Sequence, residues 1–324
     1  MKISPAYFIL TLLFMSFNSC TNSVGPNVSG IAINVLQNYT VSSICVSGNN
    51  IYAGTDGGLI FLSTDYGSNW KVLDTLVGKA YGLPVSPPPE ITSIVASDGN
   101  LFAGIGAGHF GVYLSTNNGR SWVEIDSDLL RLPSLGYPIS CLGVVNKTLF
   151  AGSLNGIFRS TNNGKNWTNS LEMSFVFQFA VIGTSIYAAS YNGVVVSSDE
   201  GLTWKVENAG LPIQPIRSII HIAGIGTSLI AWTNEGIYRF INGGANWDYV
   251  GSGLVSSDIN TLNARGNVLF AAGTGLFISS NEGANWTRTS RGSEIDSLNC
   301  LSIAFMGSEV FVGTYGYGIW RYPL

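Results

Sequence analysis

An eight-residue phrase occurs six times in this chain, and its spacing constrains the fold more than any other feature of the sequence. Every copy carries Asp or Asn at its third position, Gly at its fifth and Trp at its eighth. The copies end at Trp70, Trp122, Trp167, Trp204, Trp247 and Trp286. Successive Trp residues are 52, 45, 37, 43 and 39 residues apart. A period near 40 residues is the size of one four-stranded blade of a β-propeller.

The segments between the phrases show the strand order of such a blade. In the third repeat, ISCLGVV, TLFAGS and GIFRS precede the phrase and NWTNSL follows it, which predicts four short strands. The second strand recurs seven times, but the last repeat stops after its third strand and would leave an open sheet edge. We therefore expect residues 31–37 to supply the outer strand of the last blade. The predicted fold is an all-β, seven-bladed propeller over residues 31–324.

The phrase resembles the Asp-box, or BNR repeat, whose pattern is S-x-D-x-G-x-x-W, in six of the seven repeats. Asp stands at the third position only at Asp65 and Asp199. The other four copies carry Asn117, Asn162, Asn242 and Asn281. Both side chains can bond their own backbone two residues on, the Gly permits positive φ, and the Trp can bury a large ring against its blade. Because Asn cannot take up a proton as a carboxylate does, we interpret the box as a structural turn.

Composition limits the classes of function. Charged residues are 10% of the chain and Gly residues number 40, as expected for buried strands joined by tight turns. The net charge is −4, and no Lys/Arg stripe marks a nucleic-acid surface. His109 and His221 give no metal signature, so we expect no metal and no cofactor. His221 lies in an apolar strand and is expected in the core or the channel.

Three cysteines, Cys45, Cys141 and Cys300, fall in corresponding strands of different repeats and form no CxxC pair. We expect small buried core residues. The alternative is a disulfide between Cys45 and Cys300 across the ring closure, if the compartment is oxidising.

The N-terminus predicts a targeting segment. Residues 1–19 contain an apolar run shorter than the roughly 20 residues of a membrane-spanning helix, which is typical of a signal peptide. The segment resembles a bacterial lipoprotein signal that ends at Cys20, although Phe17 and Ser19 stand where that pattern prefers Leu and Ala or Gly. The resemblance implies a lipid-modified Cys20, a tether over residues 20–30 and attachment to the cell envelope. The absence of Asp directly after Cys20 favours the outer membrane, and plain secretion remains the alternative.

Boxes of this kind are known from sialidases and from xyloglucanase-type glycosidases, so enzymatic activity must be considered. Sialidases resemble one another in an arginine triad and an early Arg-Ile-Pro motif, which is absent from this sequence. Arg120, Arg159 and Arg239 lie within or beside boxes. Xyloglucanases place paired Asp residues between two propellers, whereas one propeller is expected here. A non-catalytic protein is favoured, with glycoside hydrolase as the alternative through a chance carboxyl pair such as Asp56 and Glu235.

The loops after the second and fourth strands are expected on the face opposite the boxes. Aromatic side chains gather in these loops with few charges, which suits contact with a peptide or a sugar, although single exposed aromatics are also common. The candidate binding residues are Tyr81, His109, Phe110, Tyr137, Tyr191, Tyr315 and Tyr317. The chain also resembles the single-propeller photosystem II assembly factor, but the basic patch expected for that partner is not visible. We therefore expect a monomeric scaffold for an unidentified protein or glycan partner.

Overall fold

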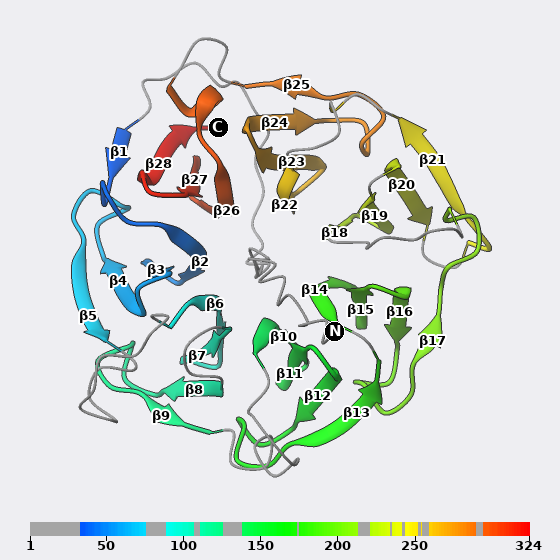
Figure 1. The fold of residues 1–324 in the computed structure, drawn as a ribbon, viewed down its shortest axis with the longest axis horizontal. Coiled ribbons are helices and arrows are strands. Elements are labelled where there is room, and N and C mark those ends of the chain that lie inside the picture. The colour runs from blue at the N-terminus through cyan, green and yellow to red at the C-terminus, as the bar shows by residue number, and fades with distance from the viewer. Residues whose placement is uncertain are drawn as a thin grey trace, which may run out of the picture.

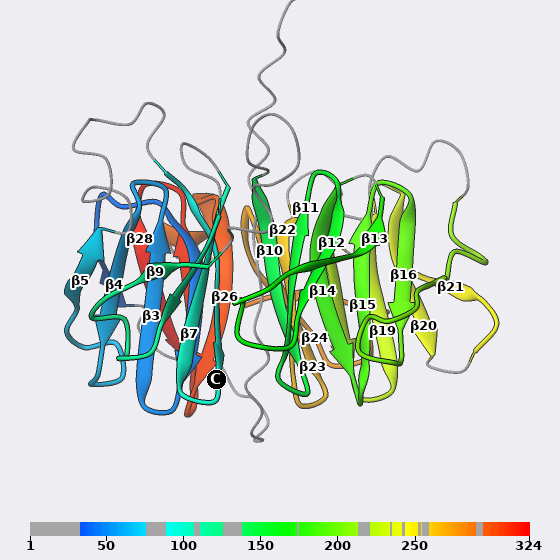
Figure 2. The same cartoon turned by 90° about the horizontal axis from the view of Figure 1, so that it is seen from below.

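The chain forms a ring of seven four-stranded antiparallel sheets in the computed structural model (Figure 1). The structure describes residues 33–75, 89–106, 111–125, 138–173, 175–212, 221–233, 235–241, 244–251, 254, 259–289 and 294–324. In each sheet the strands follow one another outward from the centre, as the repeat order predicts. The strands run between the two faces of the ring, which Figure 2 shows from the side.

The strands fall into four sets according to their position in the blade. The inner strands are β2 Val41–Ser47, β6 Ile91–Ser97, β10 Ile139–Val145, β14 Val176–Ile182, β18 His221–Ile225, β22 Ile259–Arg265 and β26 Cys300–Met306. The second strands are β3 Asn50–Thr55, β7 Asn100–Ile105, β11 Thr148–Ser153, β15 Ser185–Ser190, β19 Ser228–Thr233, β23 Val268–Gly273 and β27 Glu309–Thr314. The third strands are β4 Leu59–Ser63, β8 Gly111–Ser115, β12 Gly156–Ser160, β16 Gly193–Ser197, β20 Gly236–Ile241, β24 Gly275–Ser279 and β28 Gly318–Pro323. The outer strands are β5 Lys71–Thr75, β9 Val123–Glu124, β13 Thr168–Glu172, β17 Lys205–Val206, β21 Trp247–Gly251, β25 Thr287–Arg288 and β1 Ile33–Val35, and a 3₁₀ turn η1 covers Glu294–Ser297.

Both ends of the chain close the ring in the last blade. The sheet order β1-β28-β27-β26 places the N-terminal strand outside the three C-terminal ones, with Ile33 opposite Arg321 and Val35 opposite Ile319. This confirms the predicted closure. The strand ends at Val35, two residues earlier than expected, because Leu36 adopts a positive φ of 58° and the chain turns there.

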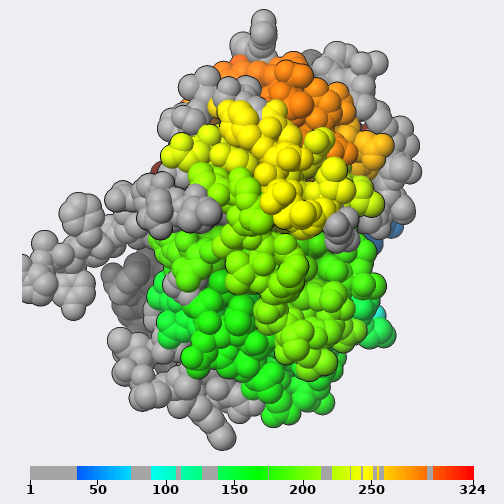
Figure 3. All heavy atoms as spheres, turned by 90° about the vertical axis from the view of Figure 1, so that its right-hand side faces the viewer, coloured from blue at the N-terminus to red at the C-terminus, as the bar shows by residue number. Residues whose placement is uncertain are grey.

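The core lies between neighbouring sheets. One cluster joins Tyr52 and Ile60 of blade 1 to Ile94 and Leu101 of blade 2, and the other neighbours are joined in the same way. The second strands are buried along almost their whole length, which explains their continuous apolar sequence. Figure 3 shows the side chains of adjacent blades meeting along the outer rim of the ring.

The three described cysteines are buried and free, so the disulfide alternative is wrong. Cys45 belongs to the cluster between blades 1 and 2, whereas Cys300 belongs to the cluster between blades 6 and 7. The two thiols therefore point into different interfaces. Burial raises the pKa of Cys141 and of Cys300 to about 12, so both remain protonated thiols.

The box forms a self-contained turn. In the third blade the Ser160 hydroxyl accepts from the Gly164 N–H at 2.9 Å, and Asn162 Oδ1 accepts from the Asn166 N–H at 2.9 Å. The side chain at the third position thus accepts the backbone N–H of the residue four positions later. The predicted hydrogen bond to the backbone two residues later is wrong, because the side chain spans the whole turn. The Gly at the fifth position has positive φ, as predicted, in five of the six boxes, for example 78° at Gly164, whereas Gly244 of blade 5 does not. Asn242 lies outside the described residues.

Candidate functional site

The face opposite the boxes, which we call the open face, is built by backbone bonds that join two sets of loops. In blades 1, 2, 4 and 7, the residue after the second strand donates its N–H to the carbonyl of the residue that precedes an inner strand. Examples are Asp56 to Thr40 at 3.3 Å and Tyr315 to Asn299 at 2.9 Å. The open face carries Tyr39, Thr40, Asp56, Glu90, Leu154, Phe175, Tyr191, Asn299, Tyr315 and Tyr317.

Three aromatic rings pack together on the open face of blade 4, and we call them the blade-4 aromatic group. The ring centroids lie 4.6 Å apart for Phe175 and Phe177, 4.8 Å for Phe177 and Tyr191, and 5.6 Å for Phe175 and Tyr191. Phe175 and Phe177 are buried, and Tyr191 is half-buried. Leu154 of blade 3 is exposed beside them and accepts the Phe175 N–H at 3.0 Å. The accessible part of this surface is therefore the half-buried Tyr191, supported from below by the two buried rings, together with the exposed Leu154.

Sequence reasoning identified Tyr191 and missed Phe175 and Phe177. A signal was present, because Phe177 takes the second position of its inner strand. Blades 1 to 3 have hydroxyl residues at this position, and these bond the carbonyl that begins the next inner strand. They are Ser42, Thr92 and Ser140.

A second aromatic group lies where the ring closes and consists of Tyr39, Tyr315 and Tyr317, which we call the closure tyrosines. Tyr315 and Tyr317 expose 55% and 56% of their surface. Their loop is tied to the N-terminal segment, since the Gly318 N–H donates to the Tyr39 carbonyl at 2.8 Å. The sequence predicted Tyr315 and Tyr317 on this face but missed Tyr39, which the closing segment carries.

Two carboxyl groups lie near each other between blades 1 and 2. Burial, together with the charge of Asp56, raises the pKa of Glu90 to about 7. Burial also raises the pKa of Asp56, while a hydrogen bond with the Thr40 side chain opposes that rise. The structure therefore couples Asp56 with Glu90 and not with Glu235. Glu235 lies across the ring in blade 5, where burial and the charge of Glu235 raise the pKa of Tyr238.

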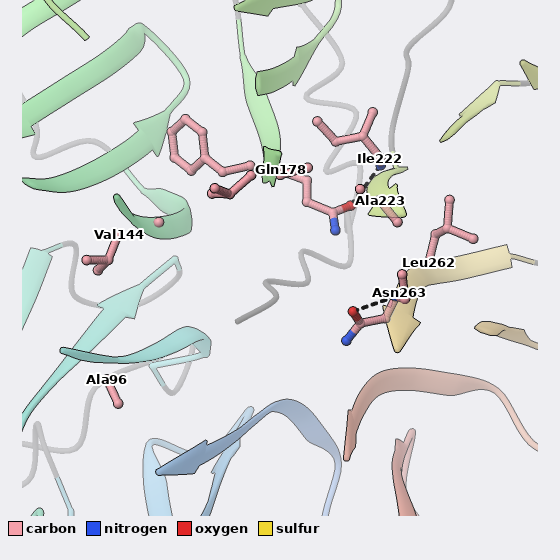
Figure 4. A pocket seen from close by; sticks show the side chains of 13 residues that line it. Ala96, Val144, Gln178, Ile222, Ala223, Leu262 and Asn263 are labelled. Atoms are coloured by element: carbon pink, nitrogen blue, oxygen red, sulfur yellow. Dashed lines mark hydrogen bonds between the residues drawn. The ribbon is translucent and has the colours of Figure 1, made fainter. Parts of the chain in front are cut away.

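The central channel contains a cavity of about 180 Å³ between the inner strands of blades 2 to 6 (Figure 4). Among the described residues that line it, the polar side chains are the carboxamides of Gln178 and Asn263. His221 is buried next to Gln178, with its Nδ1 3.3 Å from Gln178 Oε1, and burial lowers its pKa to about 3. The expected place of His221 in the core or channel is therefore confirmed.

Arginines near the boxes hold adjacent blades together. Arg159 Nε donates to the Glu200 carbonyl at 2.6 Å, and Arg239 forms an ion pair with Glu282 at 3.1 Å. Arg321 Nη1 donates to the Tyr66 carbonyl at 2.7 Å. These three arginines are held on the box face and cannot form a carboxylate-binding triad on the open face.

The remaining candidate residues, Tyr81, His109, Phe110, Tyr137 and Cys20, lie outside the described residues. Within the described ranges, no three His, Cys, Asp or Glu side chains come together as a metal site. The helices in that part of the chain include none with the length and hydropathy to cross a membrane.

Comparisons with known proteins show a shared fold. No family model and no curated protein sequence matches the chain. The structure of YCF48 bound to D1 peptide is similar, with a TM-score of 0.70 and 16% identity over 94% of this chain and 100% of that chain. The extracellular domain of the putative hybrid two component system BT4673 from B. thetaiotaomicron is also similar. Its TM-score is 0.68 and its sequence identity 17%, over 90% of this chain and 39% of that chain. The GH74 xyloglucanase from Xanthomonas campestris has a TM-score of 0.63 and a sequence identity of 17%, over 90% of this chain and 53% of that chain. At these identities the likeness establishes that the chain has the seven-bladed β-propeller fold of these proteins.

Proposed function

We propose that this propeller is a non-catalytic scaffold that binds a peptide segment of a partner protein on its open face. The observation that carries the proposal is the pair of aromatic groups on that face, in blade 4 and at the ring closure. Tyrosine combines a large contact area with one hydrogen-bonding group, and it is enriched at protein interfaces. Tyr315 and Tyr317 expose more than half of their surface on this face, so they are available to a partner.

The charges on the open face indicate which segment would bind. Asp56 and Glu90 lie between blades 1 and 2, next to the closure tyrosines of blade 7. A basic or uncharged segment is therefore favoured over an acidic one. A structurally similar propeller, YCF48, has been solved with a bound peptide, and this supports a peptide over a glycan as the ligand class.

The binding test compares tyrosines on the two faces. The chain without its signal peptide is used to capture partners from solubilised envelope, and the captured segment is then titrated against variants. Tyr191→Ala and Tyr317→Ala should each weaken binding about tenfold or more, the range of an interface hot spot. Tyr66→Ala is the matched control, since Tyr66 is 51% exposed but lies in a box. Equal affinities for all three variants and the unaltered chain would rule out the open face as the binding surface.

A glycoside hydrolase is the second candidate, and one observation favours it. Glu90, with a pKa of about 7, lies near the carboxyl of Asp56, and glycosidases use a protonated acid together with a carboxylate. The fold of a GH74 xyloglucanase is also similar. We expect no sugar release from β-glucans or sialosides. Release that is abolished by Glu90→Gln would replace the scaffold proposal by an enzyme.

We further propose that the protein is held at the cell envelope by a lipid on Cys20, with residues 20–30 as a tether and the outer membrane as the favoured location. The support is the sequence resemblance to lipoprotein signals. Cys20→Ala should move the protein from the membrane fraction to the soluble fraction. Unchanged fractionation would contradict the anchor.

A further inference from the structure

The inner strands of the ring are joined by a repeated hydrogen bond. In blades 1 and 2, the hydroxyls of Ser43 and Ser93 accept the N–H of Ile94 and of Leu142 in the next blade, each at 3.0 Å. These serines hold the third position of their inner strands. The bond satisfies a backbone donor that the sheet itself leaves unpaired.

Blade 4 makes the same bond with a longer side chain. Gln178 also holds the third position, and its Oε1 accepts the Ile222 N–H at 3.2 Å. A backbone N–H can only donate, so the atom that faces it must be the carboxamide oxygen. The neutral His221 ring places its Nδ1 3.3 Å from the same oxygen, which fixes the Nδ1–H tautomer and holds the oxygen from a second side. The NH₂ group of Gln178 must therefore point away from the blade interface.

This NH₂ group is directed into the channel cavity. Gln178 as a whole is 1% exposed, and it lines the cavity of about 180 Å³. Figure 4 shows its nitrogen turned away from Ile222 and from the blade interface. Among the described residues, Gln178 Nε2 has no hydrogen-bond partner, and it is not sealed in the core, so a ligand or a water can reach it from the cavity. A ligand that accepts a hydrogen bond from this nitrogen would replace water as its partner.

Asn263 of blade 6 presents a second donor to the same cavity. Its Oδ1 accepts the Ala264 N–H at 2.8 Å, which again fixes the oxygen toward the backbone (Figure 4). Its Nδ2 lies 3.3 Å from the Ile303 carbonyl, and the second N–H of the same group is left for a ligand. Blades 4, 5 and 7 have alanine at this position, as Ala180, Ala223 and Ala304, so the donor is peculiar to blade 6.

The rest of the cavity wall limits the ligand. The described part of the wall is made of small and apolar residues such as Gly143, Phe179 and Leu262, and no charged side chain is among them. An anion would lose its hydration without gaining a cation, and a cation would face two donors. The volume of about 180 Å³ is below the 300–1,000 Å³ of typical small-molecule pockets. The site therefore selects a small, uncharged hydrogen-bond acceptor.

We propose that the central channel holds a binding site for a small uncharged carbonyl group, of the amide type, which accepts hydrogen bonds from the NH₂ groups of Gln178 and Asn263. Most of the lining residues lie in the second halves of the inner strands, which run toward the box face. The site is thus separate from the aromatic groups of the open face, and it stands whether or not those groups bind a peptide.

The test follows the side-chain NH₂ signals of ¹⁵N-labelled mature protein by NMR. The two signals are assigned with two variants. Gln178→Ser introduces the residue that blades 1 and 2 have at this position, and Asn263→Ala introduces the residue that blades 4, 5 and 7 have at the equivalent position. N-methylacetamide is the probe, acetate is the charged control of similar size, and methyl α-glucoside supplies hydroxyl acceptors. Cys141→Ser is the matched control variant, because it alters the third position of blade 3 without removing a carboxamide. Thermal melting checks that each variant is folded.

We expect N-methylacetamide to shift both NH₂ signals in a saturable way, while acetate does not. Gln178→Ser and Asn263→Ala should each weaken binding about three- to tenfold, the worth of one hydrogen bond, and Cys141→Ser should leave it unchanged. No shift with any probe would show that the cavity holds water only and overturn the proposal. Equal shifts with acetate, or binding of the glucoside alone, would overturn it as well.

Discussion

The pKa values of carboxyl groups in the boxes and on the open face are shifted in opposite directions. On the box face, the hydrogen bond from the Asn69 side chain, with further bonds from its N–H and from Ser63, lowers the pKa of Asp65 to about 2. Bonds from the Thr203 side chain and N–H likewise lower the pKa of Asp199 to about 2. On the open face, burial and the neighbouring Asp56 raise the pKa of Glu90 to about 7.

This difference separates structural acids from candidate functional ones. The box carboxylates are satisfied within a single turn, and Asn162 makes the same backbone bond to the fourth residue as Asp65 does. A carboxylate is therefore not required in the box. Glu90 has no such local set of donors, and its pKa depends on a neighbour in another blade. Of the three carboxyl groups compared, the one with a raised pKa is thus on the open face.

The largest expected effect is a loss of stability when a side chain is added inside a tightly packed box. A Cβ at Gly201 would lie 2.4 Å from Cε1 of the fully buried Phe150, and Gly201 has a φ of 80°. Gly201→Ala should lower the free energy of unfolding by about 4 kcal/mol, through overpacking and backbone strain. Gly183→Ala is the matched control, since Gly183 has a φ of 60° but nothing within 4 Å of its Cβ position, and about 1 kcal/mol is expected. Urea denaturation of both variants checks the difference, and equal losses would contradict a tightly packed box.

The second effect tests the acid of the open face. The pKa of Glu90 is raised in the folded protein, so the folded state binds more protons than the unfolded state between about pH 4.5 and pH 7. The contribution of Glu90 to stability should therefore fall by about 3 kcal/mol as the pH rises through this range, against an opposite contribution from His221, whose lowered pKa makes stability rise between about pH 3 and pH 6.5. Glu90→Gln should remove the Glu90 contribution alone, so the stability of the variant relative to the unaltered protein should rise between pH 5 and pH 8, and the variant should be the more stable protein at pH 8.

The measurement is urea denaturation at pH 5 and pH 8. Glu124→Gln, on the exposed outer strand β9, is the control and should keep the pH dependence of the unaltered protein. A Glu90→Gln variant with the same dependence would show that Glu90 is not the group responsible.

The smallest effect is expected from exchanging Asp and Asn within boxes. Asn162→Asp and Asp199→Asn should leave stability at pH 7 nearly unchanged, because either side chain accepts the same backbone bond. The lowered pKa of Asp199 contributes stability above about pH 3.8, and this contribution is lost as the pH falls toward 2. Asp199→Asn should reduce that acid-induced loss in a melting series from pH 5 to pH 2. A large loss of stability at pH 7 would instead mean that the charge itself is needed.

The fold was predictable because its signals are local and repeated. Each blade carries its own strands and its own box, so the blade count and the closing strand followed from the order of repeats. Details that depend on one backbone angle were harder to predict from the sequence. For example, β1 ends early, at Val35, because Leu36 has a positive φ.

The candidate site was predictable only in part. Topology placed Tyr191, Tyr315 and Tyr317 on the open face, but it could not show which side chains meet there. Phe177 contacts Tyr191 only because an inner strand and a loop converge, and Glu90 meets Asp56 only because two blades lie side by side. Such contacts come from the closed ring and have no signature within one repeat. The donor of Gln178 could have been found by comparing the third positions of the inner strands.

The central claim is that the box face is structural and the open face binds the partner. The most direct test replaces Tyr317 or Tyr66 with a photo-crosslinking amino acid in living cells, since the two tyrosines are about equally exposed on opposite faces. We predict a discrete crosslinked partner from position 317 and none from position 66. Crosslinks from position 66 with none from position 317 would contradict the claim.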